Sequence, residues 1–275
     1  MKKMRLFILA IVLMAICLGI AGCSQGTAPA PSDKPTSTEA KTVDKYAYHT
    51  HNNGYYTVEG KVTLQGDKIV AAQIDELNSP ISWGQFSQNK ITDQEKAALG
   101  DENILTGLAQ LHGDPAENQF AKYIQVGDVV FTAVLKPDGF VTYSAEGIDD
   151  IVKYFDTDEA NIGWYFEQMR AGNYWILKKS GDSFEKVDIS RFTTKANGKD
   201  PLAKGESQSK RLCQHWDNWM PNIKKTEDFF LKHGVIEGEI KQTSDGAWAV
   251  ADTVSGATAT EFPNYLGILY DAYKK

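Results

Sequence analysis

The residues of this 275-residue chain best suited to chemistry lie near its C-terminus, in the run Asp252-x-x-Ser255-Gly256-Ala257-Thr258. The Thr258 hydroxyl can bond to a phosphate group, and the Ser255 hydroxyl can orient either that phosphate or the Thr258 hydroxyl by a hydrogen bond. Gly256 and Ala257 leave the backbone open to a bulky group. A threonine hydroxyl is a weak nucleophile that must be activated by a base or a metal ion, and the sequence shows no evident metal-assisted site for that step. Asp252 is unfavourable beside a phosphate unless it caps backbone N–H groups or meets a cation on another protein.

This run resembles the flavinylation motif of the FMN-binding domain family, Asp-x-x-(Ser/Thr)-Gly-Ala-Thr, whose final threonine carries FMN through a phosphoester bond. The resemblance implies covalent FMN on Thr258, with Asp252, Ser255, Gly256 and Ala257 as the other cofactor-site residues. It also implies that a separate FMN transferase of the ApbE type, using FAD and Mg²⁺, makes the bond after export and recognises Asp252. On the residues alone, a small-residue structural turn remains the other interpretation.

The elements beside the motif are expected to place Thr258 on a turn between a strand and a helix. Residues 247–251 are apolar and short, which favours a buried strand. Residues 261–273 carry apolar side chains at helical spacing, with Pro263 acceptable in the first turn. We expect free N–H groups and the positive end of that helix to stabilise a phosphate on Thr258.

The rest of the folded chain is expected to be α+β and FMN-binding-domain-like, with antiparallel hairpins, packed helices, a long central insertion and the C-terminal strand-turn-helix. Alternating apolar residues predict an opening hairpin over 55–64 and 69–74, and Asn53-Gly54-Tyr55 and Gly66-Asp67-Lys68-Ile69 loosely resemble the family's opening. Residues 78–84 are expected to form a surface turn, with Trp83 a candidate to stack on the flavin. The remaining expected elements are hairpins over 129–135/140–144 and 174–177/184–187, and helices over 92–111, 158–170 and 210–233, the last kinked or divided by Pro221.

The N-terminus predicts export and a lipid anchor. Residues 1–22 combine a basic start, an apolar run over 6–20 and small residues before Cys23, which looks like a lipoprotein signal peptide with Cys23 as the lipidated residue. An uncleaved membrane anchor is the alternative, because the apolar run approaches the ~20 residues of a bilayer span. Residues 23–44 are rich in Ser, Thr, Pro and Ala and predict a flexible linker, which leaves 45–275 as the domain.

Charge and potential metal ligands exclude some functions. The net charge is −7 with both signs interspersed, which argues against nucleic acid as a partner because phosphate binding needs a clustered basic surface. Cys213 and His215 form a Cys-x-His pair without further ligands nearby, and the pair His49-x-His51 is weaker still. We therefore expect no metal site.

Two functional interpretations follow. In the first, a lipoprotein on the outer face of the cytoplasmic membrane carries electrons on its FMN from a membrane redox enzyme to an extracytoplasmic acceptor, like relatives of the flavin subunits of sodium-pumping and ion-translocating oxidoreductases. In the second, a surface lipoprotein binds a ligand or partner without redox chemistry. The sequence contains no nucleophile–base constellation, which favours a carrier over a stand-alone enzyme.

Overall fold

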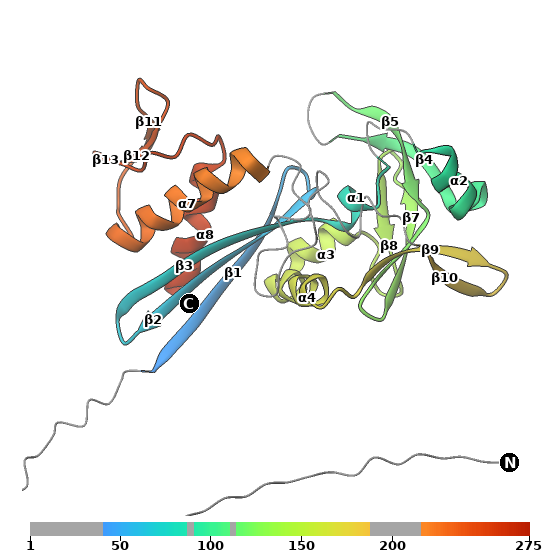
Figure 1. Ribbon diagram of the computed structural model, residues 1–275, viewed down its shortest axis with the longest axis horizontal. Coiled ribbons are helices and arrows are strands. Elements are labelled where there is room, and N and C mark those ends of the chain that lie inside the picture. The colour runs from blue at the N-terminus through green and yellow to red at the C-terminus, as the bar shows by residue number, and fades with distance from the viewer. Residues whose placement is uncertain (1–40, 87–90, 111–113, 188–215) are drawn as a thin grey trace, which may run out of the picture. The chain divides into compact units, whose positions relative to one another are not determined.

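The protein, in a computed structural model, is described over residues 41–86, 91–110, 114–187 and 216–275 (Figure 1). Its first sheet is an antiparallel meander of three long strands, β1 (Thr42–His51), β2 (Tyr56–Gln65) and β3 (Lys68–Asn78), in the order β1-β2-β3. The predicted hairpin is confirmed as β2 and β3. Strand β1 was not predicted, and it begins three residues inside the expected linker because it pairs with β2 along its whole length.

A second sheet fills much of the central part of the chain. It has five antiparallel strands in the order β10-β9-β6-β7-β8, and both hairpins predicted there are confirmed. A separate ribbon, β4 with β5, packs beside it. The strands of these two sheets are β4 (Ile104–Ala109), β5 (Ala116–Ala121), β6 (Tyr123–Val126), β7 (Val129–Leu135), β8 (Val141–Ser144), β9 (Tyr174–Ser180) and β10 (Ser183–Val187).

The prediction of one helix over 92–111 is wrong beyond Leu99. Helix α2 (Asp93–Leu99) begins at a Thr92 capping box and ends at Gly100, whose φ is +83°. A 3-10 turn (Asp101–Asn103) follows, and the chain then enters β4. Gly100 favours this stop because its left-handed conformation suits glycine and ends the helical hydrogen-bond ladder.

The other helices follow their sequence signals. Helix α4 (Glu159–Arg170) confirms the helix predicted over 158–170, and the Asp158 side chain caps its start. Helix α7 (Trp216–His233) continues through Pro221, so the proline does not divide it. The remaining helices are α1 (Pro80–Trp83), α3 (Ile151–Thr157) and α8 (Phe262–Lys274). Three short strands precede α8, namely β11 (Ile240–Gln242), β12 (Trp248–Val250) and β13 (Thr253–Val254). Among the described residues, every helix is too short or too polar to cross a bilayer.

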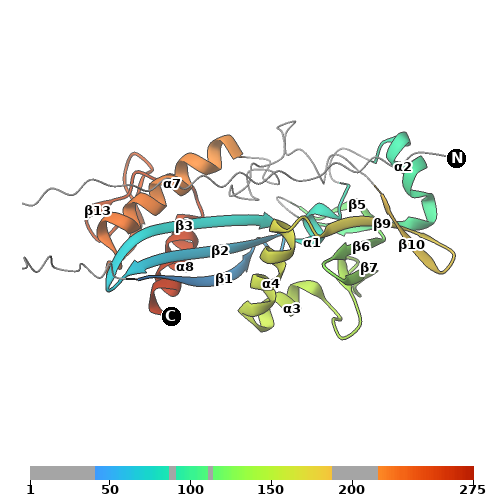
Figure 2. The same cartoon turned by 60° about the horizontal axis from the view of Figure 1, so that its bottom comes forward.

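Helices cover both faces of the first sheet. Successive side chains of a strand point to opposite faces, so neighbouring residues contact different helices. Tyr48 packs on α4 through Phe166, and Glu59 on the same face meets Arg170 of α4. On the other face, α8 comes so close to Gly60 that a Cβ there would lie 2.9 Å from the Ile268 carbonyl oxygen. Figures 1 and 2 show α7, α8 and the short C-terminal strands along one half of β1–β3 and the second sheet at the other end.

Two hydrophobic clusters correspond to these two ends. One joins α7, α8 and the C-terminal strands to the middle of the first sheet, and it includes Val58, Phe230 and Leu266. The other joins α1, α3, α4 and the second sheet, and it includes Phe131 and Tyr165. The chain is therefore an α+β protein with antiparallel sheets, packed helices and a C-terminal helix, as the sequence predicts.

Candidate functional site

The Asp252–Thr258 run lies in a hairpin and a loop immediately before α8. The apolar strand predicted over 247–251 is β12, and the helix predicted over 261–273 is α8 with Pro263 in its first turn. Between them the chain makes a tight turn at Ala251 and Asp252, then the short strand β13, then the loop that holds Ser255 to Thr260. Thr258 therefore lies between a strand and a helix, although that strand is β13 and not β12.

Ser255 and Trp248 fix the first half of the loop. The Ser255 amide and hydroxyl both donate to the Trp248 carbonyl oxygen, at 2.8 and 2.7 Å, and the Ser255 hydroxyl oxygen accepts from the Ala257 amide at 3.1 Å. The Ser255 hydroxyl is thus engaged within the loop, and it makes no described hydrogen bond to the Thr258 hydroxyl. Gly256 takes a φ of +73°, a conformation that glycine adopts without strain.

Trp248 also holds the second half of the loop. Its backbone N–H donates to the Ala257 carbonyl oxygen at 2.8 Å and its indole N–H to the Ala259 carbonyl oxygen at 2.7 Å. The indole ring stacks on Phe262, the first residue of α8. The Ala257 side chain is fully buried beneath the loop, so a larger residue would displace the loop from this position.

Asn222 of α7 holds Thr258 itself. Its side-chain oxygen accepts from the Thr258 amide at 2.7 Å, from the Thr258 hydroxyl at 3.3 Å and from the Ala259 amide at 3.2 Å. The Thr258 side chain is exposed, so its hydroxyl oxygen faces solvent from a fixed backbone. Sequence reasoning did not find Asn222, because it lies 36 residues from Thr258 and belongs to no recognisable motif.

The first three residues of α8 do not offer the free N–H groups expected there. The Phe262 amide donates to Ala259 and the Asn264 amide to Glu261, both at 3.0 Å, while Pro263 has no amide hydrogen. The Lys225 side chain of α7 also lies close to the loop, because its Cδ atom is 4.0 Å from the position that a Cβ on Gly256 would take.

The structure corrects two other predictions, one for Asp252 and one for residues 78–84. Asp252 lies in the β12–β13 turn with an exposed side chain, and among the described residues no N–H group donates to its carboxylate, so it is not a turn cap. Residues 78–84 are not a surface turn: Trp83 is buried in the cluster of the second sheet, where its indole N–H donates to the Tyr165 hydroxyl at 2.9 Å. Trp83 is therefore packed away from the Thr258 loop.

No metal centre is formed by the described residues, since no three His, Cys, Asp or Glu side chains come together suitably. His49 and His51 share one face of β1 with ring centroids 6.5 Å apart, and His51 Nε2 lies 3.3 Å from Glu76. The expected signal peptide, the Cys23 lipidation site, most of the linker, Cys213 and His215 lie outside the residues that the structure describes.

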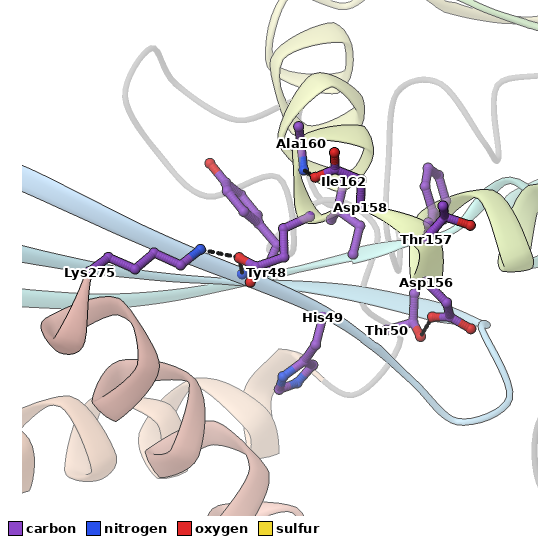
Figure 3. A pocket seen from close by; sticks show the side chains of 11 residues that line it. Tyr48, His49, Thr50, Asp156, Thr157, Asp158, Ala160, Ile162 and Lys275 are labelled. Atoms are coloured by element: carbon purple, nitrogen blue, oxygen red, sulfur yellow. Dashed lines mark hydrogen bonds and ion pairs between the residues drawn. The ribbon is translucent and has the colours of Figure 1, made fainter.

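A pocket of about 780 Å³ lies along the edge of β1, at the junction of α3 and α4 (Figure 3). Glu159 accepts hydrogen bonds from the Tyr48 amide and from Lys275, and the Thr50 hydroxyl donates to Asp156 at 2.7 Å. Figure 3 shows Thr50 and Asp156 directed at each other and His49 directed away from them. Thr258 is not among the lining residues, so the pocket and the motif loop are separate features.

Comparison of the chain with protein-family models, with curated proteins and with solved structures found no match. The candidate site therefore depends on the motif and on the geometry of its loop.

Proposed function

We propose that this protein is a lipid-anchored extracytoplasmic flavoprotein that carries FMN covalently on Thr258 and passes electrons from a membrane redox enzyme to an external acceptor. The observation that carries the proposal is the presentation of Thr258. An exposed hydroxyl stands at the end of a run that matches the flavinylation motif, on a loop whose backbone is fixed by Asn222 and Trp248.

The residues of the loop fit a bulky anionic group attached from outside. Gly256 has no side chain, Ala257 points into the core, and Ser255 is bonded inward, so only Thr258 presents a hydroxyl at the end of the motif. After esterification the Thr258 hydroxyl hydrogen is lost, but the Thr258 and Ala259 amides still donate to Asn222 and keep the attachment point in place. Lys225 supplies a positive charge beside the loop.

Another protein must make the bond. Thr258 has no general base among its described hydrogen-bond partners, because the amide oxygen of Asn222 cannot take up its proton. We therefore propose a partner FMN transferase of the ApbE type, which would approach the exposed loop and its outward-facing Asp252. A covalent link suits a protein outside the membrane, since a dissociated flavin would be lost to the surroundings. The bound flavin supplies the redox chemistry, and the protein supplies position and electrostatics.

Intact mass after co-expression with an FMN transferase of this type tests the proposal. We expect a mass increase equal to FMN less one water, and flavin fluorescence that remains after denaturation. Thr258→Ala should abolish the adduct, whereas Thr260→Ala should keep it, because both threonines are exposed on one loop but only Thr258 completes the motif. An adduct that persists in Thr258→Ala, or no adduct in the wild type, would refute the assignment.

The pocket at β1 favours a second candidate, a lipoprotein that binds a small ligand without redox chemistry. Its volume lies within the range of ligand sites in proteins, roughly 300–1,000 Å³. This function predicts a protein without flavin whose ligand affinity is lost on changing Asp156 or Glu159. The mass measurement separates the two candidates.

A further inference from the structure

The second sheet carries a surface on which lysine side chains lie over aromatic rings. The Lys186 Nζ lies 4.2 Å from the centroid of the Trp175 ring. The Nζ atoms of Lys122 and Lys179 lie 5.7 and 6.0 Å from the centroid of the Tyr123 ring. These contacts are favourable because the face of an aromatic ring is negative, and they gather the ammonium groups of three strands on one surface.

The register of the strands explains why these side chains meet. Residues that lie opposite each other in antiparallel strands point to the same face of a sheet, and so do residues two apart in one strand. Tyr123 of β6 and Lys186 of β10 both lie opposite Leu177 of β9, and Phe184 of β10 lies opposite Lys179. We call the resulting surface the lysine–aromatic face. It consists of Tyr123, Trp175, Lys179, Phe184 and Lys186, with Lys122 beside it.

The lysine–aromatic face is open to solvent. Lys179 and Lys186 are exposed, and Phe184 keeps 42% of its surface accessible. The other face of the same strands is part of the core, where Ile124 and Ile176 are buried. Strand β10 is the last in the order of the sheet, and Figures 1 and 2 show the β9–β10 hairpin extending beyond the other strands. A flat partner can therefore reach this face.

The face carries a surplus of positive charge. Within the described part of the chain, none of its lysines forms an ion pair with a carboxylate, and Lys122 donates to the backbone carbonyl oxygen of Glu102 at 3.4 Å. Glu185 lies opposite Lys178 on the other face of the hairpin, and Asp182 lies in its turn. The surface here is thus positive although the whole chain carries −7. Salt screens charges beyond about 8 Å, so the local surplus decides which partner binds.

Lysines beside exposed aromatic side chains suit the surface of an anionic membrane. Each lysine that comes close to anionic headgroups strengthens binding roughly fivefold, and aromatic side chains are favoured at the level of the headgroups. The proposed lipid anchor keeps such a surface nearby. A chain as long as the one between Cys23 and Thr42, where β1 begins, spans about 25 Å as a coil and about 60 Å when extended. The tether therefore holds the domain at a high effective concentration of headgroups.

We propose that the lysine–aromatic face docks on the anionic lipid headgroups of the membrane that holds Cys23. This inference rests on the lipid anchor of the proposed function and is independent of the flavin. The lysine ammonium groups bind the headgroup phosphates, and the Phe184 ring lies against the lipid surface between them. Together with the anchor, this second contact holds the domain against the bilayer in one orientation.

Vesicle binding by the mature chain with Cys23→Ser tests the docking without an acyl chain. We expect this protein to sediment with phosphatidylglycerol vesicles and to stay in solution with phosphatidylcholine vesicles. Added salt should release it, because the attraction is electrostatic. Failure to bind phosphatidylglycerol vesicles at low salt would overturn the proposal.

A double variant, Lys179→Gln with Lys186→Gln, assigns the binding to this face. Removing two lysines should weaken the affinity for phosphatidylglycerol vesicles roughly 25-fold. The matched control is Lys232→Gln with Lys241→Gln, which changes the net charge equally at exposed positions of α7 and β11. The control should bind as the parent does. Equal losses in the two double variants would show that net charge drives binding, and the proposed face would be wrong.

Poly-glutamate is the probe for an acidic polypeptide in place of lipid. If it bound more tightly than the vesicles and lost affinity with Lys179 and Lys186, the face would take an acidic protein and the lipid assignment would fail. Intact mass of the exported wild type tests the anchor separately. Absence of acyl groups would refute the proposed anchor, whereas an acylated chain whose Cys23→Ser form ignores phosphatidylglycerol would refute only the docking face.

Discussion

Replacing Asn222 by alanine tests whether α7 fixes the loop that presents Thr258. One side-chain oxygen accepts from the Thr258 amide, the Thr258 hydroxyl and the Ala259 amide. No other described group accepts from these two amides. Asn222→Ala therefore removes the contact between the end of the motif and the helix, while the bonds between Ser255 and Trp248 at the start of the loop remain.

The size of the effect follows from the number and exposure of these bonds. A hydrogen bond contributes about 1 kcal/mol net, and the 3.3 Å bond from the hydroxyl is the weakest of the three. Thr258 is exposed, so its amide regains water when the loop opens. We therefore expect the free energy of local opening to fall by about 1–2 kcal/mol, which is roughly a 5–30-fold increase in the open population.

Amide hydrogen exchange measures this opening directly. In Asn222→Ala, the Thr258 and Ala259 amides should exchange roughly 5–30-fold faster than in the wild type. Amides at the centre of α8, such as that of Leu269, should keep their exchange rates because the core beneath them is unchanged. The measurement uses protein without flavin, so it is independent of the attachment reaction.

Two variants make the result interpretable. Asn222→Asp keeps an acceptor oxygen in place and should restore slow exchange at Thr258 and Ala259. Asn264→Ala removes an exposed asparagine whose side chain donates only to Glu261 at 2.5 Å, and it should leave the loop unaffected. If Asn222→Ala left both loop amides as protected as in the wild type, Asn222 would not be what holds Thr258.

Two further predictions concern buried charge. Arg170 donates to both carboxylate oxygens of Glu59, at 2.6 and 3.0 Å, and to Asp75 at 3.4 Å. Arg170→Met should therefore lower the free energy of unfolding in urea by roughly 3–5 kcal/mol at pH 7, because it removes the cation that pairs with the buried Glu59 carboxylate. A free energy of unfolding equal to that of the wild type would contradict this. For Glu76, burial raises the pKa from 4.5 to about 8, so its stabilising contribution is complete below pH 4.5 and is lost as the pH rises through 8. Glu76→Gln should gain up to about 1.4 kcal/mol per pH unit relative to the wild type between pH 5 and 8 in urea unfolding, and a constant difference would show that Glu76 does not hold the proton.

Local signals explain the parts of the fold that the sequence predicted well. The opening hairpin has strict alternation and a short turn at Gly66, and α4 has a capping Asp158 at its start. Strand β1 was missed because its side chains are polar and aromatic, and its place is set by pairing with β2. The helix predicted over 92–111 ran too far because apolar residues after Gly100 fit a helix or a strand equally well.

For the site, the reactive group could be predicted from the sequence, whereas the residues that contact the Thr258 loop could be identified only in the tertiary structure. The motif, the hydroxyl of Thr258 and the following helix are local features, and they were predicted from neighbouring residues. The free N–H groups expected at the first residues of α8 are not there, because Pro263 lacks an amide hydrogen and the Phe262 and Asn264 amides bond to nearby carbonyls. Pro263 was visible in the sequence, but its consequence depends on how the turn closes.

The sequence by itself determined that Thr258 ends a small-residue run between a strand and a helix in an α+β chain, because residue type and spacing act over a few neighbours. Only the tertiary structure decided that Asn222 holds this threonine, that Trp83 is buried in the other cluster, and that His51, Glu76, Tyr265 and Trp219 share a hydrogen-bonded cluster. These contacts join residues that lie far apart in the chain. They form because β1, β3, α7 and α8 bury their apolar faces against one another, and that packing brings the polar groups within bonding distance.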